Sequence, residues 1–173
     1  DADLSCPSIG KMFGLTDYVY DFAANGKIEP VRWEGITEGQ FLEVFSLGGD
    51  IPDDQFVAWR GSQLRSMLKE QFTSVDWGDI DVLVVDLPPS TSDSVQTVLE
   101  TCGNATVVPV TINTELGISD TRKFLSLVRS KKMIISGLLL NMADVYDSTY
   151  TEDEIEEILK LTILARIAFD KSF

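Results

Sequence analysis

Four short runs of apolar residues constrain the fold of this chain more than any other feature. They cover Val82–Val85, Ala105–Val110, Ile134–Leu140 and Ile163–Phe169, and each is rich in Val, Ile or Leu with little alternation between apolar and polar positions. A strand with one face in water alternates, whereas a strand buried on both faces of a parallel sheet does not. The four runs therefore predict buried strands of a parallel sheet.

The stretches between these runs carry apolar residues at helical spacing. We predict helices over 63–72, 94–102, 119–128 and 151–161. We expect Ser94 to cap the second of them, and Thr151 with Glu154 three residues later forms the pattern of a capping box for the last. Strands that alternate with helices indicate βαβ units with right-handed crossovers. The predicted fold class is α/β, with a doubly wound, mostly parallel sheet and helices on both faces.

Residues 25–60 break this alternation. Asn25-Gly26 is a turn signal, and 27–32 and 41–47 have the composition of two strands. We therefore predict an inserted β-ribbon around 25–60. A length of 173 residues favours one domain over 1–173.

Composition excludes several classes of function. The formal net charge of −14 disfavours a broad surface for nucleic acid or for an anionic membrane. The absence of His excludes Ser-His-Asp and Cys-His catalysis and every His-ligated metal site. The two cysteines, Cys6 and Cys102, form no CxxC pair, which suits a reducing cytoplasm. No apolar run is long enough to span a membrane.

Polar residues that follow the predicted strands are the candidate site, because ligands of an open parallel sheet bind beyond the carboxyl ends of its strands. Asp86 follows the first run, and such an acid either pairs, holds a metal or caps the strand end. Asn141 follows the third run, where it could read the edge of a nucleotide base or close a loop. Asp1 and Asp3 could bind Mg²⁺ through water, orient an attacking water, or belong to a merely polar segment.

Several segments carry these residues in a recognisable order. They are DADLSCPSIGKMFGL, KIEPV followed by GI, VAWRG, QFTSVDWGDIDVLVVDLPPSTSD and GLLLNM. Together they resemble the Mrp/NBP35 (ApbC-like) branch of the MinD/ParA-type P-loop ATPases, and the tail ILARIAFD is similar to the family's final strand. The resemblance implies a P-loop NTPase-like domain that binds ATP and Mg²⁺ and that forms a homodimer with nucleotide at its interface.

The resemblance also implies roles for individual residues. Asp1 and Asp3 match the acidic switch I motif, so they would act in catalysis by positioning the attacking water and, for Asp1, Mg²⁺ through water. Asp86 matches the Walker-B acid that holds Mg²⁺. Ser90 and Ser92 stand where the second switch usually has glycines. The implied nucleotide-binding residues are Pro88, Pro89, Asn141, Met142 and Asp170.

The function that the resemblance implies is ATP-driven assembly of a metallocofactor, such as an iron–sulfur cluster, or of a metalloenzyme. The partners would be a client metalloprotein or an assembly factor, in the cytoplasm, with neither nucleic acid nor membrane. The CPxC pair of many members is missing after Met142, so no residues are assigned to a cluster.

The Gly-rich phosphate loop with its Lys is also missing. We therefore expect this sequence to be a piece of a longer protein whose N-terminal βαβ unit lies outside it, and we expect the piece to be inactive alone. Two alternatives stay open: a non-catalytic scaffold that kept the fold, and a MinD-like positioning ATPase. The acidic helix predicted over 151–161 disfavours the second alternative, because membrane positioning needs a basic amphipathic helix.

Overall fold

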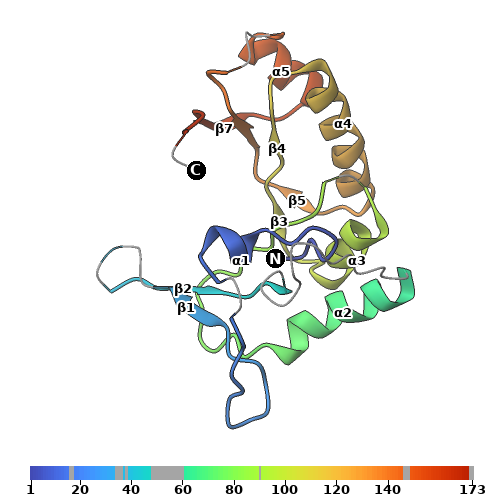
Figure 1. Cartoon of the computed structure of the whole chain (residues 1–173). Coiled ribbons are helices and arrows are strands. Elements are labelled where there is room, and N and C mark those ends of the chain that lie inside the picture. Colours follow the sequence, from blue (N-terminus) through green and yellow to red (C-terminus); the bar gives the residue numbers. More distant parts are fainter. Residues whose placement is uncertain are drawn as a thin grey trace. The chain divides into compact units, whose positions relative to one another are not determined.

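The structure is a computed structural model, and it describes residues 1–15, 18–33, 37, 39–47, 61–89, 91–145 and 149–171. The chain forms two compact units, Asp1–Thr101 and Cys102–Phe173. Figure 1 labels the helices and strands of both units. The prediction of one domain over 1–173 stays a prediction.

The first unit contains three helices and a β-ribbon within its described residues. They are α1 (Ile9–Met12), β1 (Val31–Trp33), β2 (Leu42–Val44), α2 (Gly61–Ser74) and α3 (Asp93–Thr101). Helices α2 and α3 pack against each other. Leu68 of α2 and Val95, Val98 and Leu99 of α3 are buried, so the apolar stripes of both helices form part of the core of this unit.

Strands β1 and β2 form an antiparallel ribbon, in which Val31 lies opposite Val44 and Trp33 opposite Leu42. The turn predicted at Asn25-Gly26 is present, since Gly26 has φ +78° and its N–H donates to the carbonyl of Ala23 at 2.8 Å. Only glycine adopts this left-handed conformation without strain. An antiparallel strand pair thus lies within 25–60, while the inserted ribbon over that whole range stays a prediction, since residues 34–36, 38 and 48–60 lie outside the described residues.

The prediction of a buried strand at Val82–Val85 is wrong. Residues 82–89 adopt no regular secondary structure, and Val82 and Val84 are 75% and 80% exposed. A strand needs a neighbour for its backbone N–H and C=O groups. Within the described part of the unit no strand pairs with this segment, although the N–H of Ala2 donates to the carbonyl of Asp86 at 2.8 Å. Asp86 itself is exposed.

The second unit alternates short strands with helices. Its elements are β3 (Thr106–Val107), β4 (Val110–Thr111), α4 (Glu115–Ser130), β5 (Ile134–Ile135), β6 (Leu138–Asn141), α5 (Glu152–Leu159) and β7 (Ile163–Ile167). The pairs β3–β5, β4–β6 and β6–β7 are all parallel. Three of the four predicted runs are therefore confirmed as parallel strands. Their predicted burial on both faces is wrong in part, since four of the five residues of β7 are exposed, as are Val110 of β4 and Ile134 of β5.

Two residues interrupt these strands. Pro109 separates β3 from β4 because it has no N–H to donate, although its carbonyl accepts from Leu139 N at 2.9 Å. Gly137, with φ +147°, separates β5 from β6. A Cβ on Gly137 would lie 2.8 Å from the carbonyl oxygen of Thr162 and 2.6 Å from Cγ of Leu164, so only glycine fits here.

The core of the second unit lies between one face of β6 and the two helices. Leu138 and Leu140 point to the same face because strand side chains alternate. They pack with Ile118 and Leu125 of α4 and with Ile155 and Leu159 of α5. Parallel strands with connecting helices confirm the predicted mixed α/β fold class.

One of the two predicted helix N-caps is confirmed and the other is wrong. Thr151 caps α5 and accepts from the N–H of Glu154 at 3.3 Å, while the Glu154 carboxylate accepts from the N–H of Thr151 at 2.7 Å, so the predicted capping box is confirmed. The prediction that Ser94 caps a helix is wrong. Helix α3 begins at Asp93, Ser94 is buried inside it, and the carbonyl of Ser92 accepts from Gln96 N.

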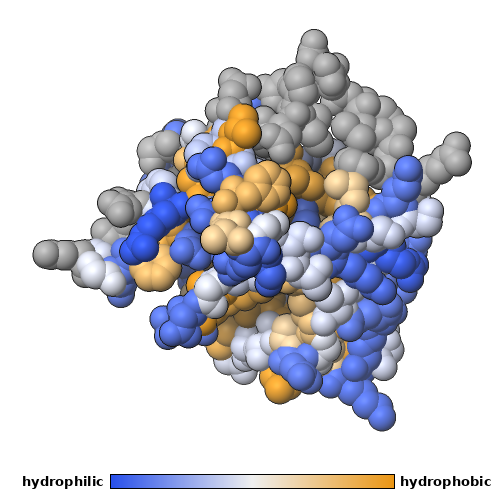
Figure 2. Space-filling view, turned by 90° about the horizontal axis from the view of Figure 1, so that it is seen from below, coloured by the Kyte–Doolittle hydropathy of each residue, from blue (hydrophilic) through white to orange (hydrophobic). Residues whose placement is uncertain are grey.

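The surface of the molecule mixes charged and apolar side chains, as Figure 2 shows for one face. The exposed large apolar side chains include Met12, Val19, Phe22, Val82, Val84, Leu116 and Ile134. Among the helices of the described ranges, none combines the length and the apolar character that a membrane crossing requires.

Candidate functional site

The carboxylate of Asp1 organises the acidic loop predicted to be switch I. Its Oδ1 accepts from the N–H of Asp3 at 3.0 Å, and its Oδ2 accepts from the N–H of Ile9 at 3.0 Å and from Oγ of Ser46 at 2.9 Å. The nitrogen of Asp1 donates to the carbonyl of Phe45 at 2.9 Å. Asp1 therefore ties the loop to the start of α1 and to the end of β2.

Asp3 organises the next turn of the same loop. Its Oδ1 accepts from the N–H groups of Ser5 and Cys6, both at 3.1 Å. Among the described residues, its second carboxylate oxygen has no hydrogen-bond partner. Asp3 can therefore offer Oδ2 to a cation or to a water while its other oxygen keeps the loop in place.

Asp86 lies beside this loop. The N–H of Ala2 donates to the carbonyl of Asp86. Since Ala2 stands between Asp1 and Asp3 in the chain, this hydrogen bond joins the acidic loop to the segment that contains Asp86. The structure thus brings together three predicted site residues of the first unit: Asp1, Asp3 and Asp86.

The two prolines follow Asp86 in the chain. Pro88 is half-buried and Pro89 is exposed. Each fixes its own φ and lacks an N–H, so the segment after Asp86 is held in an extended course. Ser90, one of the two serines that replace the usual glycines, lies outside the described residues.

The predicted base-side residues belong to the second unit. Asn141 is the last residue of β6, pairs in register with Ile167 of β7, and accepts through Oδ1 from the N–H of Met142 at 3.0 Å. Met142 has φ +50°, a left-handed conformation that costs energy for a residue with a Cβ. The chain therefore turns sharply at the carboxyl end of β6.

The segment that contains Asp170 lies against this turn. Ala143 N–H donates to the carbonyl of Ile167 at 3.0 Å, and Oδ1 of Asp144 accepts from the N–H of Phe169 at 2.6 Å. Asp170, next in the chain, is exposed. The structure thus brings the Asn141–Met142 turn and the Asp170 segment to one edge of the sheet.

Two supporting residues were missed from the sequence. Ser46, with 1% of its surface exposed, holds Oδ2 of Asp1 through its hydroxyl. The hydroxyl of Tyr20 both donates to the carbonyl of Ser46 at 2.7 Å and accepts from its N–H at 2.8 Å. No local pattern links Tyr20, Ser46 and Asp1, because their contacts are long-range.

Asn113 was also missed, although a signal was present. It comes three residues after the second apolar run, whereas Asn141 follows the third directly, and it lies beyond β4, the strand that pairs with β6. It is buried, and its side chain bonds to the backbone of Tyr150. The rule that singled out Asn141 would have found it.

A small cavity of about 30 Å³ adjoins Asp1 and Ala2 in the first unit. Gln71 and Trp77 line it, and their buried atoms Nε2 and Nε1 have no hydrogen-bond partner among the described residues. Buried donors of this kind are rare in folded proteins. Two buried donors without a partner among the described residues thus lie beside Asp1.

The described residues contain no group of three or more His, Cys, Asp or Glu side chains that could hold a metal ion by itself. Cys6 is exposed in the acidic loop, and Cys102 is half-buried after α3. A Mg²⁺ ion at Asp3 and Asp86 would thus need further oxygen ligands from water or from a nucleotide, which is how Mg²⁺ is commonly held. The two cysteines do not form a cluster site within this chain.

Parallel strands with polar side chains beyond their carboxyl ends are the architecture of nucleotide-binding α/β proteins. The family model of ParA, described as NUBPL iron-transfer P-loop NTPase, matches residues 1–166. The chain belongs to this family, and the resemblance drawn from its motifs is confirmed.

Individual relatives agree with the family. The chain is 30% identical over 147 residues to an iron-sulfur cluster carrier protein of Pyrococcus furiosus, covering 83% of this chain and 50% of that protein. It is 32% identical over 143 residues to an iron-sulfur cluster carrier protein of Pseudomonas fragi, covering 83% and 48%. The chain therefore spans about half the length of the curated relatives it matches.

A solved structure supports the fold. The nucleotide-binding protein of Archaeoglobus fulgidus, solved in complex with ADP, aligns with a TM-score of 0.70 and 25% identity, covering 99% of this chain and 68% of that one. The P-loop NTPase-like fold is therefore shared along nearly the whole chain.

Proposed function

We propose that the protein is a Mg²⁺-dependent ATPase that assists the assembly of iron–sulfur clusters or of the metalloenzymes that carry them. The observation that carries this proposal is the hydrogen bond between Ala2 and Asp86, which brings two acidic segments from distant parts of the sequence together. The membership of the family of iron-transfer P-loop NTPases supports it.

Asp1, Asp3 and Asp86 have different roles in this proposal. Asp1 is the positioning residue, because both of its carboxylate oxygens already accept hydrogen bonds that fix the loop. Asp3 would orient the attacking water through Oδ2, and Asp86 would hold Mg²⁺ together with water and nucleotide oxygens. The ion, when bound, supplies charge stabilisation for phosphoryl transfer. The predicted role of Asp1 as a ligand of Mg²⁺ through water belongs to the same proposal.

The base of the nucleotide would bind at the carboxyl end of β6. Asn141 offers an amide that can donate and accept, while Met142 and Asp170 lie on the two segments that meet there. Pro88 and Pro89 would stiffen the segment that faces the phosphates. The relative from Archaeoglobus fulgidus, a nucleotide-binding protein in complex with ADP, supports nucleotide binding as such.

The partners in this proposal are a second copy of the protein and a client metalloprotein or assembly factor in the cytoplasm. The names of the curated relatives support an iron–sulfur cluster as cargo. The chain's own cysteines do not supply a ligand set for it, so we assign no residue to the cluster.

The test uses the intact gene product with and without Mg²⁺. Asp86→Asn removes one charge and should lower ATP turnover by about 100-fold, the scale of losing one electrostatic catalytic group. The matched control is Asp81→Asn, an exposed acid of the same segment, which should keep full turnover. Unchanged turnover in Asp86→Asn would overturn the catalytic assignment. A wild-type protein that binds no nucleotide would instead indicate the non-catalytic scaffold.

A further inference from the structure

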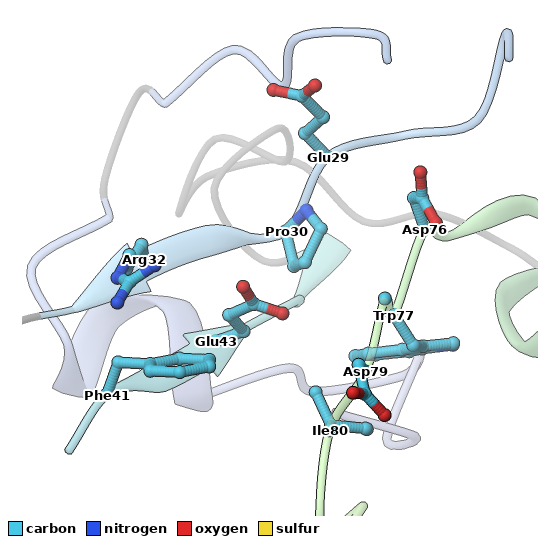
Figure 3. A pocket seen from close by; sticks show the side chains of 10 residues that line it. Glu29, Pro30, Arg32, Phe41, Glu43, Asp76, Trp77, Asp79 and Ile80 are labelled. Atoms are coloured by element: carbon cyan, nitrogen blue, oxygen red, sulfur yellow. The ribbon is translucent and has the colours of Figure 1, made fainter. Parts of the chain in front are cut away.

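A groove lined by none of the proposed ATPase residues lies between the β1–β2 ribbon and the segment 76–80. Its volume is about 340 Å³, and Figure 3 shows the side chains that line it. The apolar part of its wall comes from Pro30, Phe41, Trp77 and Ile80. The groove is of the size that accepts a side chain with a short stretch of backbone.

The charged part of the groove is mostly negative. Glu29, Glu43, Asp76 and Asp79 contribute four carboxylates, against the single guanidinium of Arg32. Figure 3 shows Glu43 between the aromatic ring of Phe41 and the side chain of Trp77. Several carboxylates beside an apolar wall raise the local concentration of cations.

The groove already binds one guanidinium of its own chain. The Cζ atom of Arg32 lies 4.0 Å from the centroid of the Phe41 ring, which is a cation–π contact. Trp77 offers a second, larger aromatic surface on the opposite wall, formed by the segment 76–80. Trp77 is half-buried as a residue, and tryptophan is the strongest cation–π acceptor among the side chains.

The acids of this groove do not converge closely enough to chelate a metal ion. Within the described ranges no three acidic, His or Cys side chains form such a group. Asp76 is also engaged, because its Oδ2 accepts from the side-chain amide of Asn25 at 2.8 Å. Dispersed carboxylates around aromatic rings suit an extended organic cation better than a compact inorganic one.

We propose that this groove binds an arginine or lysine side chain presented by a basic segment of a partner protein. The cationic head would lie among Glu43, Asp79 and Glu29, and its aliphatic stem would pack on Trp77. The strong negative charge of the whole chain favours the approach of a basic partner and disfavours nucleic acid. The proposal uses none of the residues assigned to ATP hydrolysis, so it stands or fails independently.

The experiment titrates the intact gene product with a fluorescein-labelled peptide of alternating arginine and glycine. Glu43→Gln and Asp79→Asn should each weaken binding by roughly fivefold, the effect of losing one partly exposed charge pair. Glu70→Gln on α2 changes the charge equally but lies outside the groove, and it should change the dissociation constant less than twofold. A peptide with norleucine in place of arginine should not bind.

A second measurement reports on the groove directly. In a ¹H–¹⁵N correlation spectrum of the ¹⁵N-labelled protein, the Trp77 indole cross-peak is the one that is lost in Trp77→Phe. This cross-peak should shift when the arginine peptide is added and should not shift when the norleucine peptide is added. Because Glu43 lies opposite Arg32 in the ribbon, the thermal unfolding of Glu43→Gln should be measured to check that this variant is folded. Asp79 is exposed, so Asp79→Asn is a second, independent variant. Equal weakening by Glu43→Gln and Glu70→Gln, or an unshifted Trp77 indole, would overturn the proposal.

Discussion

The side-chain amide of Asn113 holds the backbone of Tyr150 by two hydrogen bonds. Its Nδ2 donates to the carbonyl of Tyr150 at 2.8 Å, and its Oδ1 accepts from the N–H of the same residue at 3.2 Å. Asn113 follows β4, and Tyr150 directly precedes the N-cap of α5. One buried amide thus ties the carboxyl end of β4, an edge strand of its three-stranded sheet, to the start of a helix.

Replacing Asn113 should destabilise the protein. Asn113→Leu leaves the N–H and C=O of Tyr150 without their partner and should lower the free energy of unfolding by about 1–3 kcal/mol. Asn113→Asp keeps the acceptor but places a negative oxygen beside the carbonyl of Tyr150, so it should also destabilise. Urea unfolding measures both, with Asn104→Asp, at an exposed position, as the control. An unchanged midpoint in Asn113→Leu would contradict this role.

The capping box of α5 predicts a defined pH dependence. Hydrogen bonds from the backbone and then from the side chain of Thr151 lower the pKa of Glu154. Because its pKa is lower in the folded state, the stabilisation is complete above the unfolded pKa near 4.5 and is lost as the pH falls through the folded value. Glu154→Gln should therefore flatten the loss of stability on acidification, as followed by thermal unfolding between pH 3 and 7 (about the range that Glu titrates in).

Two variants separate the cap from general charge effects. Thr151→Ala should lower stability by about 1 kcal/mol at neutral pH, the usual effect of losing an N-cap, whereas Thr151→Ser should preserve it. Glu157→Gln, on the same helix but outside the capping box, should leave the acid limb of the profile unchanged relative to wild type. An acid limb that Glu154→Gln does not alter would contradict the assignment.

The sequence predicted the second unit better than the first for a physical reason. The runs that became β3 to β7 pair with each other within the unit, so their apolar character and their strand conformation agree. The run Val82–Val85 has the same composition, but composition does not supply a pairing partner, and the segment stays exposed. Strand formation depends on a neighbour, whereas a helix such as α5 carries its caps in its own sequence.

The same difference separates contacts between sequence neighbours from the long-range contacts of the candidate site. Thr151 and Glu154 act at short range and could be read directly, and the interruption at Pro109 could have been read from its missing N–H. The contact between Ala2 and Asp86 joins distant segments, so only the family resemblance indicated it. The supports of Asp1, namely Ser46 and Tyr20, carried no signal at all, because a hydroxyl that bonds across the fold has no characteristic spacing in the sequence.

The hydroxyl group of Tyr20 should contribute to the stability of the fold, apart from the contacts of the ring. Tyr20→Phe keeps the ring contact with Phe45, whose centroid lies 4.9 Å away, but leaves both the carbonyl and the N–H of buried Ser46 without this partner. We expect a loss of about 1–3 kcal/mol in the free energy of unfolding. Tyr18→Phe, the neighbouring ring in the same aromatic cluster, is the matched control and should change it by less than about 0.5 kcal/mol. Equal effects of the two variants would contradict a specific role of the Tyr20 hydroxyl.

The two cysteines should react at different rates with an alkylating reagent. Burial raises the pKa of the Cys102 thiol, so less of it is thiolate at a given pH, and its partial burial also hinders access. Cys6 is exposed in the acidic loop. With iodoacetamide at pH 8 we expect Cys6 to be modified several-fold faster, and the rate at Cys102 to keep rising toward higher pH, as measured by peptide-resolved mass spectrometry. Unfolding in urea should bring the two rates together, since only the fold distinguishes the thiols, and faster labelling of Cys102 in the folded protein would contradict its burial.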